Sequence, residues 1–339
     1  MNTPETKYYI GIDGGGTKTK FLLGRLIEGY GEDGAETSGL EVVGEYTAGG
    51  CHYMQIGFDG LEELMRKGIE AVCENAGIKT EDVAFVYAGF AGYGDVVSDQ
   101  PMIDEAMDKA LGDIPFAMGN DSENALEGAL SGRPGINIIA GTGSIGSGRN
   151  ESGEFMRCGG WHYVLGGDEG SAYWIAWNLL KEYSRQSDGR DEKTLLYEAV
   201  NRALDLKTDD EMVTRVVNEW HLDRTRIAGL APVVSQLYEE GDPYAIEILN
   251  DCAKELADLA IVLHDKLGFE NMSESGSNAG AGAADAPVPV SGTGGVFKIG
   301  SPVTEPFDKI LREHGMEYVK PAHTPDMGAL MLAVKHGQV

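Results

Sequence analysis

The stretch YYIGIDGGGTKTKFLLG, residues 8–24, places three consecutive glycines between an aspartate and a Thr-Lys-Thr run. Apolar residues alternate or run together on both sides of the glycines, over residues 8–12 and 19–23, which is the pattern of a β-hairpin. Glycines let a backbone approach a phosphate closely, and lysine and hydroxyl groups suit anions. The stretch therefore predicts two strands joined by a phosphate-binding turn.

Two familiar phosphate-binding motifs do not fit this chain. A Walker A loop needs Lys-Ser/Thr after its last glycine and must open a helix, whereas Gly16 is followed by Thr17-Lys18 and a strand-like run. The segment GTGSIG, residues 141–146, matches G-x-G-x-x-G, but the residues at 147–150 are a poor helix start for a dinucleotide-binding fold. Both glycine turns are therefore predicted to be hairpin turns.

The strand, Gly/Thr turn and strand recur in the second half of the chain, at GINIIAGTGSIGSGRN, residues 135–150. A single glycine turn is most often only a connection between strands. Two turns with the same chemistry, each after a buried strand, favour a two-sided phosphate clamp. The repeat predicts two similar α/β domains with a cleft between them.

The remaining pattern divides the chain near residue 118. An N-terminal domain is predicted over 1–118 and a C-terminal domain over 119–339, and the last helix, 326–339, is open to assignment to either. A small, polar, Gly- and Ala-rich stretch at about 271–286 is predicted to be a flexible surface loop. Periodicity and turn residues predict strands at 40–47 and 82–92, and helices at 58–77 and 101–112. They also predict a strand and then a helix within 114–130, and a strand, glycine turn and helix start within 286–297. Long helical stretches are predicted from about 171 to 268, with interruptions near 187–191 and 241–243.

Composition narrows the function classes. The chain of 339 residues has 27 Lys and Arg against 55 Asp and Glu, a net charge of −28, which argues against nucleic-acid binding. It has no apolar run of membrane-spanning length and no apolar signal segment at its start, so we expect a cytoplasmic protein without a membrane partner. Its four cysteines are widely spaced, which argues against a zinc or iron–sulfur knuckle and favours reduced thiols.

These motifs resemble those of the actin/hexokinase/Hsp70 superfamily, and within it the BadF/BadG/BcrA/BcrD group, which includes N-acetylglucosamine kinase. IGIDGGGTKTK (10–20) and IIAGTGSIG (138–146) are similar to its two phosphate motifs, and VSGTGGVF (290–297) is similar to its adenosine motif. CGGWHYVLGGDEGSAYWIA (158–176) resembles its sugar-site signature and is the most specific match. The resemblance implies two ribonuclease H-like domains flanking an ATP/substrate cleft, and ATP- and Mg²⁺-dependent phosphorylation of a hexosamine.

The resemblance also implies roles for individual residues. Asp13 would hold Mg²⁺ through water, and Asp121 would be the catalytic base, although its position alone fits a helix cap equally well. Asp168 and Glu169 would bind sugar hydroxyls, although taken alone they fit charges at the start of a helix better. The ATP contacts would be Gly14, Gly15, Gly16, Thr17, Lys18, Gly141, Thr142, Gly143, Ser144, Gly294 and Gly295, and the other substrate contacts Cys51, His52, Gly160, Trp161 and His162.

Two departures from the family pattern leave the sugar open between N-acetylglucosamine and glucosamine. Cys51 stands where the sugar kinases have an asparagine before the histidine and aromatic residue, and the sugar signature carries one extra residue. The family also includes ATPases that activate radical dehydratases through an iron–sulfur cluster, and a nucleotide- or sugar-binding regulator without turnover is a third possibility. A homodimer is the form that the resemblance implies.

Overall fold

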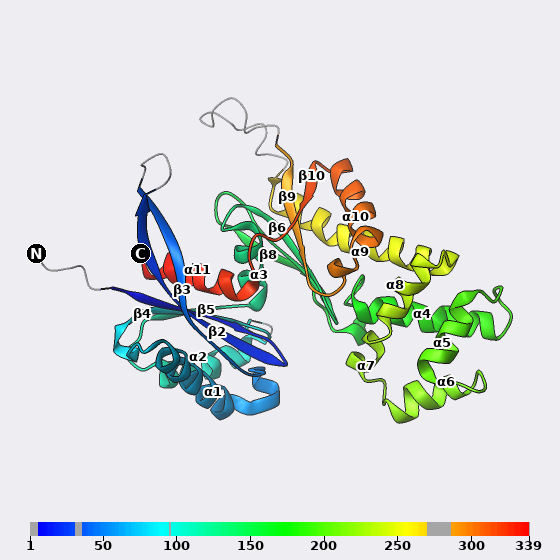
Figure 1. The fold of residues 1–339 in the computed structure, drawn as a ribbon, viewed down its shortest axis with the longest axis horizontal. Coiled ribbons are helices and arrows are strands. Elements are labelled where there is room, and N and C mark those ends of the chain that lie inside the picture. Colours follow the sequence, from blue (N-terminus) through cyan, green and yellow to red (C-terminus); the bar gives the residue numbers. More distant parts are fainter. Residues whose placement is uncertain (1–5, 31–35, 95, 270–285, 339) are drawn as a thin grey trace, which may run out of the picture. The chain divides into compact units, whose positions relative to one another are not determined.

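The computed structural model describes residues 6–30, 36–94, 96–269 and 286–338. The chain forms two compact units, which can be followed by colour in Figure 1. Unit 1 comprises Met1–Arg133 and Pro321–Val339, and unit 2 comprises Pro134–Lys320. Apart from residue 286, the loop predicted at 271–286 lies outside the described residues.

Unit 1 is built on a five-stranded mixed sheet in the order β3-β2-β1-β4-β5. Strand β1 is antiparallel to β2 and parallel to β4. Its strands are β1 (Tyr8–Gly14), β2 (Lys18–Tyr30), β3 (Glu36–Gly49), β4 (Val83–Phe90) and β5 (Phe116–Gly119). Its helices are α1 (Tyr53–Ala76), η1 (Thr80–Asp82), η2 (Val97–Asp99), α2 (Gln100–Leu111), α3 (Asp121–Leu130) and α11 (Pro325–Gly337).

Unit 2 repeats this topology, with a five-stranded sheet in the order β10-β9-β6-β7-β8. Its first strand, β6, is antiparallel to β7 and parallel to β9, as β1 is to β2 and β4. The strands are β6 (Gly135–Ala140), β7 (Ser144–Arg149), β8 (Phe155–Gly159), β9 (Val288–Thr293) and β10 (Met316–Val319). The two similar α/β domains predicted from the repeated glycine turn are confirmed.

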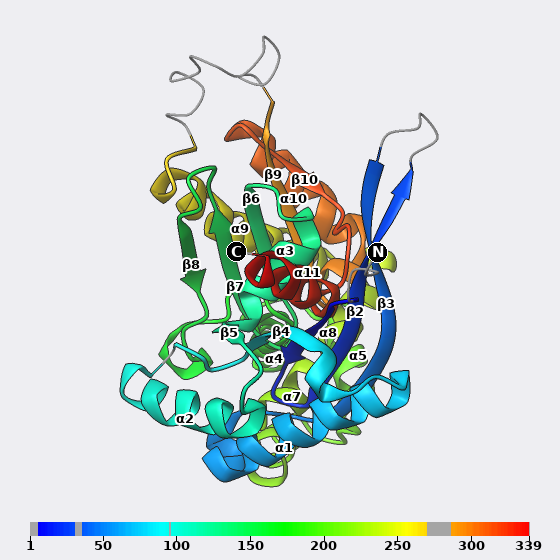
Figure 2. The same cartoon turned by 90° about the vertical axis from the view of Figure 1, so that its left-hand side faces the viewer.

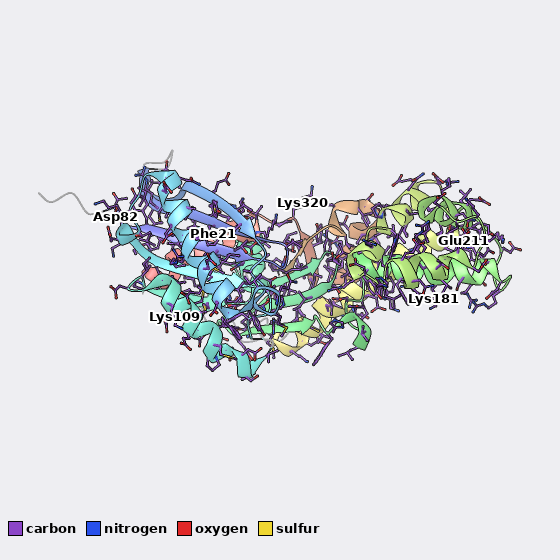
Figure 3. The ribbon with its side chains drawn as sticks, turned by 90° about the horizontal axis from the view of Figure 1, so that it is seen from below. Phe21, Asp82, Lys109, Lys181, Glu211 and Lys320 are labelled. Carbon is purple, nitrogen blue, oxygen red and sulfur yellow. The ribbon has the colours of Figure 1, made fainter. Side chains whose placement is uncertain are left out.

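A long run of helices separates β8 from β9 in unit 2. The predicted interruptions near 187–191 and 241–243 fall after α4 and before α9. Lys181 on α4 and Glu211 at the start of α6 mark this helical part in Figure 3. The helices of unit 2 are η3 (Tyr163–Leu165), α4 (Ala172–Ser187), α5 (Leu195–Leu204), α6 (Glu211–Val213), η4 (Thr214–Glu219), α7 (Arg224–Ala228), α8 (Ala231–Glu239), α9 (Pro243–Lys266), η6 (Phe297–Ile299) and α10 (Ser301–Glu313).

Alternation along β1 creates two packed faces in unit 1. Ile10 and Ile12 are buried on the face covered by α1 and α2, in one cluster with Phe21 of β2 (Figure 3). Tyr9 is buried on the opposite face, with residues of α11. Figures 1 and 2 show the sheet of this unit with α1 and α2 on one side and α11 on the other. The two-residue period of a strand therefore forms two cores from one apolar segment.

The structure places both α3 and α11 in unit 1, so the division differs from a boundary at residue 118. The reason is a close contact between these two helices, which the sequence separates by almost 200 positions. A Cβ atom on Gly328 would overlap the backbone of Asn124 and Gly128. Glycine at this crossing lets the two helix backbones approach each other more closely than side chains would allow.

We expect Gly328→Ala to lower the free energy of unfolding by about 1–3 kcal/mol, because the added methyl group forces the two helices apart. The measurement is urea denaturation followed by far-UV circular dichroism. Gly49→Ala is the matched control, because a Cβ atom there meets nothing within 4 Å. Equal unfolding midpoints for the two variants would contradict this packing.

Candidate active site

The first glycine turn is held by hydrogen bonds from neighbouring segments of unit 1. The Gly15 N–H donates to the Lys18 carbonyl at 2.8 Å and closes the turn. The carbonyl oxygens of Gly14 and Gly15 accept hydrogen bonds from the N–H groups of Ala91 at 2.8 Å and Cys51 at 3.1 Å. Gly16, Thr17 and Lys18 are exposed. The turn is thus fixed from beneath, and its exposed residues remain accessible to a ligand.

Cys51 lies beneath this turn and is fully buried. A Cβ atom on Gly14 would overlap its Sγ atom, and burial raises the pKa of the thiol to about 11. Cys51 is thus a neutral packing residue under the turn, and its contact with the substrate stays a prediction. Cys51 stands where the family pattern has an asparagine, and its side chain packs against the backbone of the glycine turn.

His52 follows Cys51 and is the residue before the first turn of α1. Its ring stacks on Tyr53, with ring centroids 5.5 Å apart. Its Nδ1 atom is buried and has no hydrogen-bond partner within the part of the chain that the structure describes. A buried polar nitrogen normally has a partner, so the unpaired Nδ1 atom sets His52 apart from an ordinary packing residue.

Asp13 lies near the end of β1, directly before the glycine turn, and a side chain of α3 holds it. The side-chain amide of Asn124, in α3, donates to Asp13 Oδ1 at 2.9 Å, to the Gly89 carbonyl at 2.9 Å and to the Ile12 carbonyl at 3.3 Å. Burial raises the pKa of the Asp13 carboxyl to about 6, although the Asn124 bond opposes the shift. Asn124 lies outside the predicted site residues, and its spacing of three residues after Asp121 is the only signal for it in the sequence.

Asp121 is the first residue of α3, and Asn120 is the N-cap. The Asn120 side chain accepts from the Ser122 N–H at 3.1 Å, and the Glu123 carboxylate accepts from the Asn120 N–H at 3.1 Å. This capping box assigns the cap role, which the sequence left open for Asp121, to its neighbour. The negative charges of Asp121 and Asp13 both help to raise the pKa of the Cys51 thiol.

The second glycine turn, in unit 2, is held by the start of α4. Gly141 N–H donates to the Gly143 carbonyl at 2.8 Å. The first N–H groups of α4, from Ala172 and Tyr173, donate to the carbonyls of Gly141 at 2.9 Å and Thr142 at 3.3 Å. Thr142 is exposed. Within the described chain, no hydrogen bond is found for the N–H groups of Thr142 and Gly143, which leaves two donors at the tip of the turn.

Ser144, predicted to contact phosphate, uses both of its donors within unit 2. Its hydroxyl donates to the Glu169 carbonyl at 2.6 Å, and its N–H donates to Asp168 Oδ1 at 3.1 Å. The other oxygen of Asp168 pairs with Arg224 Nη2 at 2.5 Å. Arg224 was not foreseen, because 56 residues separate it from Asp168.

Asp168 and Glu169 do not begin a helix, since the N-cap of α4 is Ser171. Asp168 has a left-handed backbone, with φ of 67°, and is buried. Burial raises the pKa of its carboxyl, and the Arg224 charge and the Ser144 N–H partly offset that shift. The interpretation of these two residues as helix-terminal charges is therefore wrong.

The segment before them presents an aromatic side chain to solvent. Trp161 is 71% exposed. His162 accepts from the Val164 N–H through Nδ1 at 3.4 Å, and the neighbouring Gly160 has a φ of 72°. Among the described residues, no group of three or more His, Cys, Asp or Glu side chains is arranged to hold a metal ion.

The third glycine segment follows β9. Gly294 has a φ of 101°, and a Cβ atom there would overlap the Ala140 carbonyl at the end of β6. A Cβ atom on Gly295 would meet nothing within 4 Å. A side chain is therefore excluded at the first glycine, while the space over the second is open.

Known proteins resemble this chain in sequence over most of its length. The chain is 33% identical over 257 residues to the N-acetylmuramic acid/N-acetylglucosamine kinase of Clostridium acetobutylicum, covering 74% of this chain and 77% of that one. It is 28% identical over 272 residues to the N-acetyl-D-glucosamine kinase of Dictyostelium discoideum, covering 77% and 81%.

None of the described helices combines the length and apolar character of a membrane span.

Solved structures share the fold. A candidate N-acetylglucosamine kinase from Chromobacterium violaceum gives a TM-score of 0.70 at 24% identity, covering 97% of this chain and all of that one. A ROK family glucokinase from Streptomyces griseus, in complex with glucose and AMPPNP, gives 0.54 at 16% identity, covering 97% and 99%. The two units are thus actin/hexokinase-like domains. The chain matches the BadF/BadG/BcrA/BcrD ATPase family over residues 10–333, and it belongs to that family.

Proposed function

We propose that this protein is an ATP-dependent sugar kinase that transfers the γ-phosphate of ATP to a hydroxyl of a hexosamine, N-acetylglucosamine or glucosamine. Relatives at 28–33% identity over most of the chain are kinases of these sugars. The observation that carries the proposal is the hydrogen bond from Asn124 to Asp13, which ties the helix that begins with Asp121 to the end of β1. Phosphoryl transfer requires this combination of positioned charge and a base.

The proposal assigns both glycine turns to the phosphates of ATP. Thr17 and Lys18 in unit 1 and Thr142 in unit 2 are exposed at the turns and carry hydroxyl or ammonium donors. Ser144 supports its turn from within, since both of its donors are engaged. We assign the adenosine to the open space over Gly295.

The residues around Asp13 fit a magnesium ion. Mg²⁺ prefers oxygen ligands and is commonly held by one or two carboxylates together with substrate phosphates and water. Asp13 offers a half-buried carboxylate directly before the phosphate turn. The ion, held through water, would neutralise charge on the transferred phosphate.

Asp121 is the proposed base. It would accept the proton of the sugar hydroxyl while the hydroxyl oxygen bonds to the γ-phosphorus and the bond to the bridging oxygen of ADP breaks. The capping box at Asn120 and Glu123 fixes the helix start from which its side chain projects. For the sugar we propose Trp161 as an apolar wall and His52, Gly160, His162, Asp168 and Glu169 as polar contacts. We further propose a cytoplasmic homodimer.

A coupled ADP-release assay over a panel of sugars tests the proposed function. We expect ADP formation to depend on N-acetylglucosamine or glucosamine, with a sugar phosphate detected by ³¹P NMR. Plain hexoses serve as the comparison, and an iron assay of the purified protein tests the activator alternative. ADP release that is independent of every sugar, or no release at all, would contradict the proposal.

Asp121→Asn should keep nucleotide affinity and lower kcat by about 10²–10⁴, because the amide cannot accept the proton. Initial rates and isothermal titration calorimetry with ADP measure the two quantities. Asp113→Asn, an exposed carboxylate in the same unit, is the control for the loss of one charge. Near-normal turnover of Asp121→Asn would remove the residue from the base role.

Asp13→Asn should stabilise the fold at neutral pH while it weakens Mg²⁺-dependent nucleotide binding. The pKa of Asp13 is about 6 in the folded chain, against an ordinary aspartate value of 3.8. As pH rises, the Asp13 carboxyl therefore loses its proton in the unfolded chain before it does so in the folded chain. The free energy of unfolding falls between about pH 4 and 6 and stays lower above that range. We expect a higher urea midpoint than wild type at about pH 7.5 and a smaller difference at about pH 5. An unchanged difference would show that the Asp13 charge does not destabilise the fold.

A further inference from the structure

We propose that Arg224 binds a phosphate group of the nucleotide at the second glycine turn, which adds a charged contact to a motif of backbone and hydroxyl donors. The inference rests on the proposed function. Arg224 is the first residue of α7 and lies outside the glycine turns, the sugar-site signature and the adenosine motif.

The guanidinium lies against the tip of the turn. A Cβ atom on Gly143 would overlap both Arg224 Nη2 and Asp168 Oδ1. The same turn carries the N–H groups of Thr142 and Gly143, for which the described chain offers no hydrogen-bond acceptor. A cation and two backbone donors are therefore present at one turn, a combination that binds phosphate oxygens.

Arg224 also has unused hydrogen-bonding capacity. A guanidinium has five N–H donors, and within the described chain that of Arg224 bonds to Asp168 Oδ2 through Nη2. Its Nε atom is buried and has no partner among the described residues. The side chain is still 34% exposed, and the guanidinium lies 5.4 Å from the centre of the Tyr163 ring, which limits its orientation. An oriented guanidinium with free donors can bind two phosphate oxygens at once.

The negative charge beside the second glycine turn also favours a cation at this position. The chain carries a net charge of −28, and the buried Asp168 carboxylate lies directly beside the turn through its bond to the Ser144 N–H. A carboxylate there would repel a triphosphate unless a cation offsets it. Arg224 pairs with Asp168 and lies on Gly143, so it can remove this repulsion and attract the phosphate.

Titration calorimetry of Arg224→Gln with AMP, ADP and a non-hydrolysable ATP analogue, each with Mg²⁺, tests the inference. We expect AMP affinity to stay within about 3-fold of wild type and analogue affinity to fall about 10–100-fold, because charge-assisted hydrogen bonds to phosphate are lost. Arg226→Gln is the matched control: it removes the same charge from an exposed position two residues further along α7. We expect it to bind all three nucleotides as wild type does.

Other outcomes would overturn the inference. An equal loss for AMP and the analogue would mean that Arg224 only maintains the turn, and a raised sugar KM with normal nucleotide affinity would mean that it acts only on Asp168. Arg224→Lys keeps the charge and provides a second test if the glutamine variant does not fold. We expect its affinity for the ATP analogue to lie below that of wild type. An affinity equal to that of wild type would contradict a bidentate contact. If wild type itself binds none of the nucleotides, the proposed function fails instead.

Discussion

The buried side-chain amide of Asn124 joins the segments of unit 1 that carry Asp13 and Asp121. The side chain of Asn124 donates to the Asp13 carboxylate and to backbone carbonyls of β1 and of β4. A Cβ atom on Gly89 would overlap this amide, so the glycine at that point of β4 is needed to admit it. Because Asn124 lies one helical turn after Asp121, the same contact fixes the helix that carries the proposed base relative to the strand that carries the proposed magnesium residue.

This arrangement keeps a charge where the fold would favour a neutral group. Burial raises the pKa of Asp13, and Asp326 raises it further, whereas Asn124 and the two lysines Lys18 and Lys20 lower it. Asp326 is itself paired with Lys20 at 2.6 Å, so the C-terminal helix contributes to the electrostatics of the N-terminal turn. Carboxylates whose burial is unfavourable are common at catalytic sites, where a ligand or ion supplies the missing compensation.

Local patterns account for what the sequence predicts correctly. The hairpins formed at the two glycine turns and the interruptions around α4 and α9 all depend on residues within a few positions of one another. The repeat of one turn chemistry was enough to predict two domains of one topology. What could not be predicted depends on contacts over long separations: Asn124 with Asp13 across 111 residues, Arg224 with Asp168 across 56, and α11 with α3. The burial of Cys51 beneath the turn could not be predicted either, because its place in a sequence motif says nothing about which side of a turn the side chain packs on.

The central claim is that Asn124 acts on the site through Asp13, and a double-mutant cycle tests it most directly. The cycle compares the affinity of Mg²⁺-ADP, relative to metal-free ADP, in wild type, Asp13→Asn, Asn124→Ala and the double variant, with circular dichroism confirming that each is folded. If Asn124 acts through Asp13, each single variant weakens the metal-dependent affinity, and the double variant binds no more weakly than Asp13→Asn alone. If the two losses multiply in the double variant, the residues act independently and the claim is contradicted.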